Sequence, residues 1–340
     1  MNLSSADIQE LKEFIAFPKG VAILTHRNPD GDAIGSSLAL RYFLEKFGHV
    51  VKIILPSEYP ATFHYLKGVD DCLVFDNQPS ICFDTIKKAD LICCLDFNSL
   101  DRVDKMGPVV IESKAKKLLI DHHLDPEPFA DYVLSDTGAS STCELIHQFI
   151  YQLGEMEKLD ASIGDALFTG LITDTGSFKY NTRPETYRVA ATLKERGVDD
   201  YGLQDKIFNT VSEKQMRLLG HCLANRMEVI PEYGAGIIAL TKQDYLDFDI
   251  RRGDTEGVVN YLLMLKGIEV AAFIREQPTI VKLSLRSKGD ISVQEICRNH
   301  FNGGGHKNAS GGAAYAKLQD IVDRFKNVLP KYVPKKVPVL

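Results

Sequence analysis

The stretch T-H-R-N-P-D-G-D, residues 25–32, places His26, Asp30 and Asp32 directly behind the apolar run V-A-I-L. Crowding carboxylates together costs energy, because each negative charge disfavours the ionised form of its neighbours. Two interpretations of this stretch compete. In the first, it is a solvated turn whose aspartates cap the helix that follows. In the second, a bound metal ion neutralises the acidic charge and the histidine supplies a nitrogen ligand.

Similar residues follow other apolar runs in the first half of the chain. L-I-C-C-L is followed by Asp96, K-L-L-I by Asp121, His122 and His123, and L-I-T by Asp174. Taken singly, each of these residues has an ordinary interpretation as a cap or a turn. In an open α/β sheet, however, the carboxyl ends of the strands line the crevice where ligands bind. The repeated pattern therefore favours one shared functional site.

The residue types indicate which ligand this site would take. Imidazole nitrogens together with aspartate oxygens suit manganese, iron, cobalt or zinc better than an all-oxygen magnesium site. The candidate ligands outnumber the needs of one ion, which indicates a two-metal site with one bridging carboxylate. These six candidates are His26, Asp30, Asp32, Asp96, His122 and Asp174.

The elements that would position these residues follow from the hydrophobic pattern. Apolar runs at 20–24, 50–55, 90–96 and 117–123, separated by helical patterns, predict a parallel sheet with helices on both faces. The later sequence predicts a smaller domain with a mixed sheet and helices. We therefore expect an α/β protein with its active site in the cleft between two domains. The expected ranges are a catalytic domain over 1–197, a polar linker over 198–215, a second domain over 216–330 and an extended tail over 331–340.

Composition excludes several classes of partner. The 340-residue chain has 46 acidic and 40 basic residues, and its net charge of −6 provides no positive field for a long duplex nucleic acid. Its seven cysteines lack C-x-x-C spacing and are expected to be buried small hydrophobic residues. With no signal-peptide pattern and no membrane-spanning run, we expect a cytoplasmic protein that does not bind membranes. The sequence is compatible with an oligomer.

The motifs resemble those of a known family. H-R-N-P-D-G-D-A-I-G-S, L-D-F, I-D-H-H and I-T-D-T-G are similar, in order and spacing, to the four motifs of the DHH phosphoesterase superfamily. The segment F-N-G-G-G-H-K-N-A-S-G-G resembles the glycine-rich signature of that superfamily's substrate-binding domain. The chain is most similar to the bacterial nanoRNase/pAp phosphatases of the NrnA type, over nearly its whole length.

The resemblance implies roles for the residues at the strand ends. It implies two divalent metal ions, with manganese expected, and Asp96 as the bridging ligand. The first ion would be held by His26, Asp30 and Asp96, and the second by Asp32, Asp96, His122 and Asp174. Asp121 would orient an imidazole, and His123 would face the substrate phosphate.

The second domain contains a candidate phosphate clamp. The three glycines of the G-G-G-H segment let a backbone approach an anion closely, while His306 and Arg286 supply charge or hydrogen bonds. Alone, these features would indicate a flexible turn and a surface ion pair. In a chain that also has a predicted two-metal site, these features predict substrate-binding residues, namely Arg286, Gly303, Gly304, Gly305 and His306.

One further segment, S-D-T-G-A-S-S-T-C-E-L-I at 135–146, places several hydroxyl residues at the start of a predicted helix. Helix capping is the first interpretation of this segment. An anion site at the helix terminus is the alternative.

Together with the two-metal site expected from the residues, the resemblance implies a manganese-dependent phosphoesterase that acts by two-metal activation of water. Its expected substrates are short oligoribonucleotides of about two to five residues, which need a pocket and not a long basic groove. These would be cut to mononucleotides, and a nucleoside 3′,5′-bisphosphate, 3′-phosphoadenosine 5′-phosphate, would be cut to AMP. The alternatives are a linear or cyclic dinucleotide phosphodiesterase, an inorganic pyrophosphatase, a single-strand exonuclease and a non-catalytic nucleotide sensor.

Overall fold

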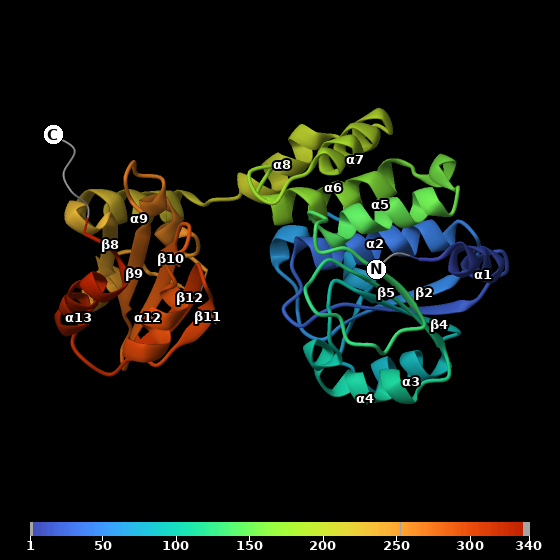
Figure 1. The fold of residues 1–340 in the computed structure, drawn as a ribbon, viewed down its shortest axis with the longest axis horizontal. Helices are drawn as coiled ribbons and strands as arrows, with labels where there is room; N and C mark the ends of the chain where they lie inside the picture. Colours follow the sequence, from blue (N-terminus) through green and yellow to red (C-terminus); the bar gives the residue numbers. More distant parts are fainter. Residues whose placement is uncertain (1–2, 252, 336–340) are drawn as a thin grey trace. The chain divides into compact units, whose positions relative to one another are not determined.

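The chain folds into two compact units, which are described separately below. The computed structural model describes residues 3–251 and 253–335. Unit 1 is Met1–Thr210 and unit 2 is Val211–Leu340. Each unit has one six-stranded sheet with helices packed against it (Figure 1). Hydrophobic clusters lie on both faces of each sheet.

The sheet of unit 1 is entirely parallel, with strand order β3-β2-β1-β4-β5-β6. Its central strands read as continuous apolar runs because both faces of a parallel sheet are covered. All five residues of β4, L-I-C-C-L, are buried. The strands are β1 Gly20–Leu24, β2 Val50–Leu55, β3 Leu73–Val74, β4 Leu91–Leu95, β5 Lys116–Asp121 and β6 Tyr132–Ser135.

Helices cover both faces of this sheet, as the sequence predicts. Helices α2, α5 and α6 lie over one face, and α3 and α4 lie over the other (Figure 1). Neighbouring strand residues point to opposite faces, so Ile23 packs in the first cluster and Leu24 in the second. The helices are α1 Ser5–Ile15, α2 Gly31–Glu45, α3 Pro79–Lys88, α4 Gly107–Glu112, α5 Thr142–Gln152, α6 Ala161–Thr175, α7 Pro184–Glu195 and α8 Asp200–Phe208.

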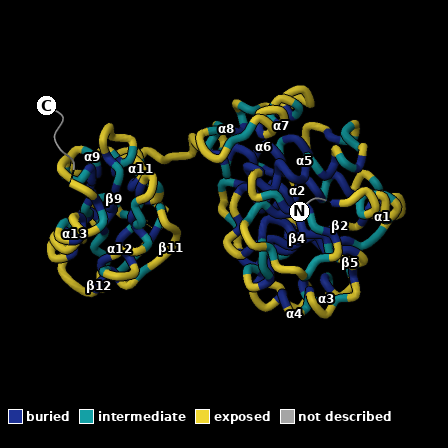
Figure 2. Tube along the Cα trace, in the orientation of Figure 1, coloured by how far each residue is buried: buried dark blue, intermediate teal, exposed yellow. Residues whose placement is uncertain are grey.

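Helix α2 packs unusually closely against α6. A Cβ atom at Gly35 would lie 2.4 Å from the carbonyl oxygen of Ala166, so only glycine fits there. Every residue of α2 from Gly31 to Leu40 is buried, as Figure 2 shows in dark blue. This packing holds the first turn of α2 against the last turns of α6, where a Cβ at Gly31 would meet Thr173.

The structure differs from the predicted linker over residues 198–215. Asp200–Phe208 forms helix α8, and its Leu203 side chain is buried in the core of unit 1. Unit 1 accordingly extends to Thr210. Most residues of this helix are polar. The few apolar side chains that anchor it to unit 1 therefore give no clear helical pattern in the sequence.

Unit 2 contains a mixed sheet, with strand order β11-β12-β10-β9-β8-β7. β8 and β9 pair in parallel, and the remaining pairs are antiparallel. Helices α12 and α13 cover one face, and α9 and α11 pack on the other. The strands are β7 Met227–Ile230, β8 Ala235–Leu240, β9 Val270–Glu276, β10 Val281–Ser287, β11 Gly304–His306 and β12 Ala309–Ala314. The helices are α9 Glu213–Asn225, α10 Lys242–Asp247, α11 Val258–Leu263, α12 Val293–His300 and α13 Leu318–Tyr332.

Helix α13 runs further than the sequence predicts. It includes Pro330 and ends at Tyr332, within the range expected to be an extended tail. Phe325 and Leu329 pack in the core, and the amide of Val333 donates to the Leu329 carbonyl. These contacts sustain the helix although proline lacks an amide donor. Of the rest of the predicted tail, residues 333–335 lie outside helices and strands, and residues 336–340 lie outside the described residues.

The predicted fold class is confirmed, namely a parallel α/β sheet followed by a smaller mixed-sheet unit. All seven cysteines are buried, also as predicted. Within the described part of the chain, no helix has the length and apolar character needed to cross a membrane.

Candidate active site

The candidate ligands of unit 1 converge at the carboxyl ends of three adjacent strands. His26 follows β1, Asp96 follows β4, and His122 follows β5, and these strands are neighbours in the order β1-β4-β5. Asp30 caps the start of α2, and Asp174 lies in the last turn of α6. The close packing of α2 on α6 therefore brings helix residues to the same edge as the strand ends.

One cluster forms around His26. Its Nε2 atom lies 3.4 Å from Asp96 Oδ2 and 3.9 Å from Asp30 Oδ1. His26 and Asp96 are buried, whereas more than half of the Asp30 side chain is exposed. Asp30 Oδ1 also accepts from the amides of Asp32 and Ala33. Capping the helix and facing a cation are thus compatible roles for this carboxylate.

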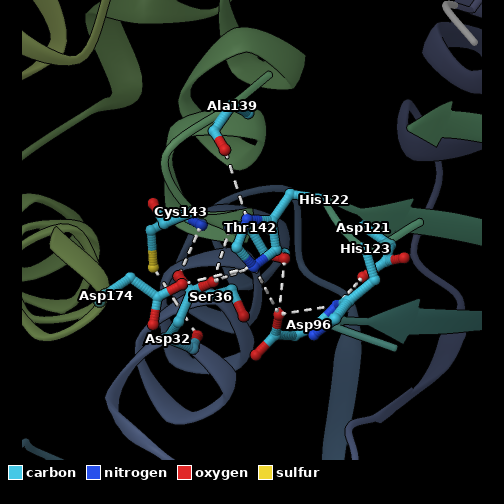
Figure 3. Close-up of polar contacts among 12 residues, drawn as sticks. Asp32, Ser36, Asp96, Asp121, His122, His123, Ala139, Thr142, Cys143 and Asp174 are labelled. Carbon is cyan, nitrogen blue, oxygen red and sulfur yellow. Dashed lines mark hydrogen bonds and ion pairs between the residues drawn. The ribbon is translucent and has the colours of Figure 1, made fainter. Parts of the chain in front are cut away.

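A second cluster surrounds His122, as Figure 3 shows. Its Nε2 atom lies 3.3 Å from Asp174 Oδ2, 3.5 Å from Asp96 Oδ1 and 3.9 Å from Asp32 Oδ2. Asp96 therefore turns one oxygen toward His26 and the other toward His122. The structure brings all six candidate ligands together, and Asp96 lies between the two clusters.

Both histidines are held in the orientation that a metal ligand needs. His26 Nδ1 lies 2.9 Å from the Arg27 carbonyl oxygen, and His122 Nδ1 lies 3.3 Å from the Ala139 carbonyl oxygen. A carbonyl oxygen can only accept, so Nδ1 is the protonated nitrogen in each neutral ring. Each Nε2 then presents its lone pair to the carboxylates, which is the arrangement usual for histidines that bind metals.

The carboxylates of this site are costly to ionise without a cation. Burial, followed by the charges of Asp32, Asp96 and Asp30, raises the pKa of Asp174 to about 10. Burial and Asp32 likewise hold the pKa of Asp96 well above its usual range.

The donor set fits divalent cations. Three donor atoms within 4.8 Å of one another come from His26, Asp30 and Asp96 in one group, and from Asp32, His122 and Asp174 in another. A third such group contains Asp96, His122 and His123. Nitrogen and oxygen donors in this proportion suit manganese-like ions. Such ions would take the place of the protons that the buried carboxyls otherwise hold.

The hydroxyl-rich segment has both of the roles considered for it. Ser141 is the N-cap of α5 and accepts from the amide of Glu144. The amides of Thr142 and Cys143 donate to the two oxygens of Asp32, at 2.6 and 2.9 Å. The anion at this helix terminus is thus a carboxylate of the protein itself. The Thr142 hydroxyl also donates to Asp96 Oδ1, at 3.0 Å, a contact that the sequence did not predict.

A buried polar network anchors the start of α5. Glu144 accepts from the Ser140 hydroxyl at 2.6 Å and from the Thr186 hydroxyl at 2.8 Å. Arg183 Nε donates to the same carboxylate, and its Nη1 donates to Asp136. Arg183 carries no sequence signal, because its partners lie about 40 residues earlier in the chain.

Asp121 holds His123 beside the two clusters. His123 Nδ1 lies 2.7 Å from Asp121 Oδ1, and Asp121 is fully buried while about a third of the His123 side chain is exposed. His122 and His123 line a hollow of about 720 Å³, with Asn98 and Asn181 also on its wall. A substrate phosphate has room to enter at this point.

The glycine-rich segment of unit 2 has a structural role that the sequence did not predict. Gly304–His306 forms β11, which pairs with β12. A Cβ at Gly303 would lie 2.0 Å from the Gly311 carbonyl oxygen. The amide of Gly303 donates to the Cys297 carbonyl. Gly305 has φ 141° and also has no room for a Cβ. Gly304 and His306 are exposed, and Arg286 is half-buried on β10.

Comparisons with known proteins identify the family of this chain. The family model of the DHH N-terminal domain matches residues 20–171, and that of the DHHA1 domain matches residues 236–331. A solved exopolyphosphatase-related protein from Bacteroides fragilis is 38% identical, covers 97% of both chains and has a TM-score of 0.88. The chain belongs to the DHH family. It is accordingly a phosphoesterase.

Relatives in the DHH family include nucleases. The bifunctional oligoribonuclease and PAP phosphatase NrnA of Thermus thermophilus is 29% identical over 91% of this chain and 88% of its own. A structure of exonuclease RecJ bound to manganese covers 98% of this chain and 96% of its own, with 14% identity and a TM-score of 0.55. At this level of sequence identity, the similarity to RecJ shows a shared fold alone.

Proposed function

We propose that this phosphoesterase uses two divalent ions, expected to be manganese, to hydrolyse short oligoribonucleotides to mononucleotides. We propose that it also converts 3′-phosphoadenosine 5′-phosphate to AMP. The observation that carries this proposal is the position of Asp96, whose two oxygens face two separate histidine-carboxylate clusters. The similarity to NrnA supports the choice of substrates.

In this proposal the two clusters hold one ion each. His26 and Asp30 serve the first ion, and Asp32, His122 and Asp174 serve the second, with Asp96 shared between them. When bound, such ions polarise the phosphoryl oxygens and lower the pKa of an attacking water. The carbonyls of Arg27 and Ala139 keep both imidazoles oriented for this role.

His123 acts on the substrate in this proposal. Asp121 fixes its Nδ1 atom, so Nε2 is the nitrogen that can reach a phosphoryl or leaving oxygen. Water forms the new bond to phosphorus while the bond to the nucleoside oxygen breaks, and that oxygen takes up a proton. A protonated His123 can donate a hydrogen bond to the oxygen on which charge develops.

The residues proposed for substrate binding in unit 2 are Arg286, Gly304 and His306, with Gly303 and Gly305 shaping the backbone beside them. Their role would be to bind a part of the nucleotide that is not cleaved. Variants of Arg286 should therefore raise KM more than they lower kcat.

Hydrolysis assays with and without a chelator test the proposed function. Manganese-loaded protein should cleave ribonucleotides of two to five residues and 3′-phosphoadenosine 5′-phosphate, and chelator should abolish both reactions. Pyrophosphate and a cyclic dinucleotide belong in the same panel. Exclusive cleavage of either one would replace this proposal by the corresponding alternative.

Asp96→Asn tests the shared ligand. The substitution removes a charge from both clusters, so turnover should fall by roughly a thousandfold or more, as expected when a charge that acts on the transition state is lost. Asp84→Asn is the matched control, because the Asp84 side chain is 68% exposed and pairs with Lys88 on α3. Full activity of the Asp96 variant would refute the shared-ligand assignment.

A further inference from the structure

Two arginines line one small hollow in unit 2. Arg275 on β9 and Arg286 on β10 both contribute to the wall of a hollow of about 280 Å³. In the strand register, Arg275 lies opposite Lys282 and Phe273 lies opposite Ser284. Because side chains alternate along a strand, these residues and Arg286 share one face of the sheet. Three basic side chains therefore gather over two neighbouring strands.

The Arg275 guanidinium is held in place by neutral partners. Its Nη1 donates to the Thr255 hydroxyl at 3.1 Å, and its Nη2 donates to the Ser284 hydroxyl at 3.2 Å. Its central carbon lies 5.1 Å from the centroid of the Phe273 ring, which is buried. Its Nε is buried without a hydrogen-bond partner among the described residues. A guanidinium has five N–H donors, so donors remain for a ligand.

No ion pair compensates the charge of these two arginines within the described residues, although Glu256 also lies on the wall of the smaller hollow. Other arginines of unit 2 form ion pairs, such as Arg217 with Glu213 and Arg226 with Asp244. Among the described residues, no carboxylate lies within 4 Å of the guanidinium of Arg275 or Arg286. Burial lowers the pKa of Arg286, but arginine remains charged in proteins. Holding an unpaired charge away from water costs free energy, which an anion in the hollow would offset.

The dimensions favour part of a nucleotide. Small-molecule sites occupy roughly 300–1,000 Å³. The hollow of about 280 Å³ that Arg275 and Arg286 line therefore suits a phosphate group and not a whole dinucleotide. A neighbouring hollow of about 590 Å³ shares Gly253, Thr255 and Arg275 and is also lined by Lys282. Arg275 thus stands where the two hollows meet, and a group attached to the phosphate could extend into the larger one.

We propose that Arg275 and Arg286 form a subsite for a phosphate group of the nucleotide ligand other than the one that is cleaved. This inference rests on the proposed function and adds Arg275, with its Thr255 and Ser284 supports, to the substrate-binding residues. A planar guanidinium matches phosphate with two parallel hydrogen bonds. The Phe273 ring and the hydroxyls of Thr255 and Ser284 hold the Arg275 guanidinium in position.

The test compares AMP with adenosine as ligands of the full chain in the presence of chelator. Without metal, the acidic clusters of unit 1 offer no attraction to phosphate, so the difference between the two ligands reports on unit 2. Calorimetry should show that AMP binds roughly tenfold or more tightly than adenosine, because the phosphate gains charge-assisted hydrogen bonds. Arg275→Met and Arg286→Met should each reduce this preference markedly.

Two further variants make the result decisive. Arg217→Met is the matched control, because the Arg217 side chain is 73% exposed on α9 and should leave the preference intact. Arg275→Lys keeps the charge but not the planar fork, so it should restore only part of the preference. If Arg275→Met fails to fold, as judged by circular dichroism, Arg286→Met decides the question, and an unchanged preference for AMP in that variant would overturn the proposal.

The remaining outcomes separate this inference from the proposed function. Equal binding of AMP and adenosine by the wild type, or an unchanged preference in Arg275→Met, overturns the subsite. If manganese-loaded wild type still hydrolyses bis(4-nitrophenyl) phosphate in that case, the proposed function stands without it. A phosphate preference with no hydrolysis of any phosphoester would instead support the subsite and refute the proposed function.

Discussion

Asp174 shows how the surroundings of a single residue can hold a proton that a bound metal ion would have to displace. Its carboxyl lies among three other carboxyls at the end of α6, and burial together with their charges raises its pKa to about 10. In the metal-free protein this group keeps its proton at neutral pH. A divalent ion must displace that proton before the carboxylate can serve as a ligand.

This displacement predicts that metal affinity rises with pH. Because the pKa of Asp174 is raised in the metal-free protein, lowering the pH strengthens proton binding in competition with the metal. Manganese titrations at pH 6 and pH 8 should give tighter binding at the higher value. Calorimetry in two buffers of different ionisation enthalpy should also detect proton release at pH 7. A pH-independent affinity without proton release would contradict this account.

At the scale of elements, helix α5 acts as a support for the site. Its first two amides hold Asp32, its Thr142 hydroxyl holds Asp96, and Glu144 fixes the helix start through Arg183. Helix α5 therefore positions carboxylates that come from two other parts of the chain.

Thr142→Val should weaken manganese binding without unfolding the protein. The valine is similar in shape but cannot donate to Asp96, and loss of such an outer hydrogen bond typically costs about 10- to 100-fold in metal affinity. Thr142→Ser keeps the hydroxyl and should recover most of the affinity. Thr192→Val is the matched control, because Thr192 is half-buried on α7 and its hydroxyl donates to the Arg188 carbonyl of the same helix. Wild-type affinity in Thr142→Val would show that the hydroxyl has no positioning role.

At the scale of the whole molecule, the chain consists of two units with separate cores. The segment 209–212 between α8 and α9 is exposed and lies outside helices and strands. Exposed segments of this kind are preferred sites of proteolysis.

Brief thermolysin treatment should therefore cut near Val211 and leave two resistant fragments. Mass spectrometry should find ends close to the boundary between Thr210 and Val211. The predicted boundary near residue 197 would instead give cleavage before α8. First cleavage within α8 would show that this helix is not stably packed on unit 1.

The sequence predicts the strands and the residues that follow them, but not helix α8 or the contacts between residues far apart in the chain. Carboxyl ends of neighbouring parallel strands must meet, so the convergence of His26, Asp96 and His122 follows from three short apolar runs. Helix α8 was missed because Leu203 and its apolar neighbours are few among polar residues. The bond from Thr142 to Asp96 joins residues that are 46 positions apart, and local patterns carry no information on such a contact.

Asp96 also has a left-handed backbone, with φ 64°. Aspartate, asparagine and glycine tolerate this conformation better than other residues do. Glutamate carries the same carboxylate, yet its longer side chain would displace the oxygens and its backbone would be strained. A relative with asparagine or glycine here could keep the fold while losing the shared ligand. The backbone conformation at position 96 therefore restricts which residues can replace the shared carboxylate without strain.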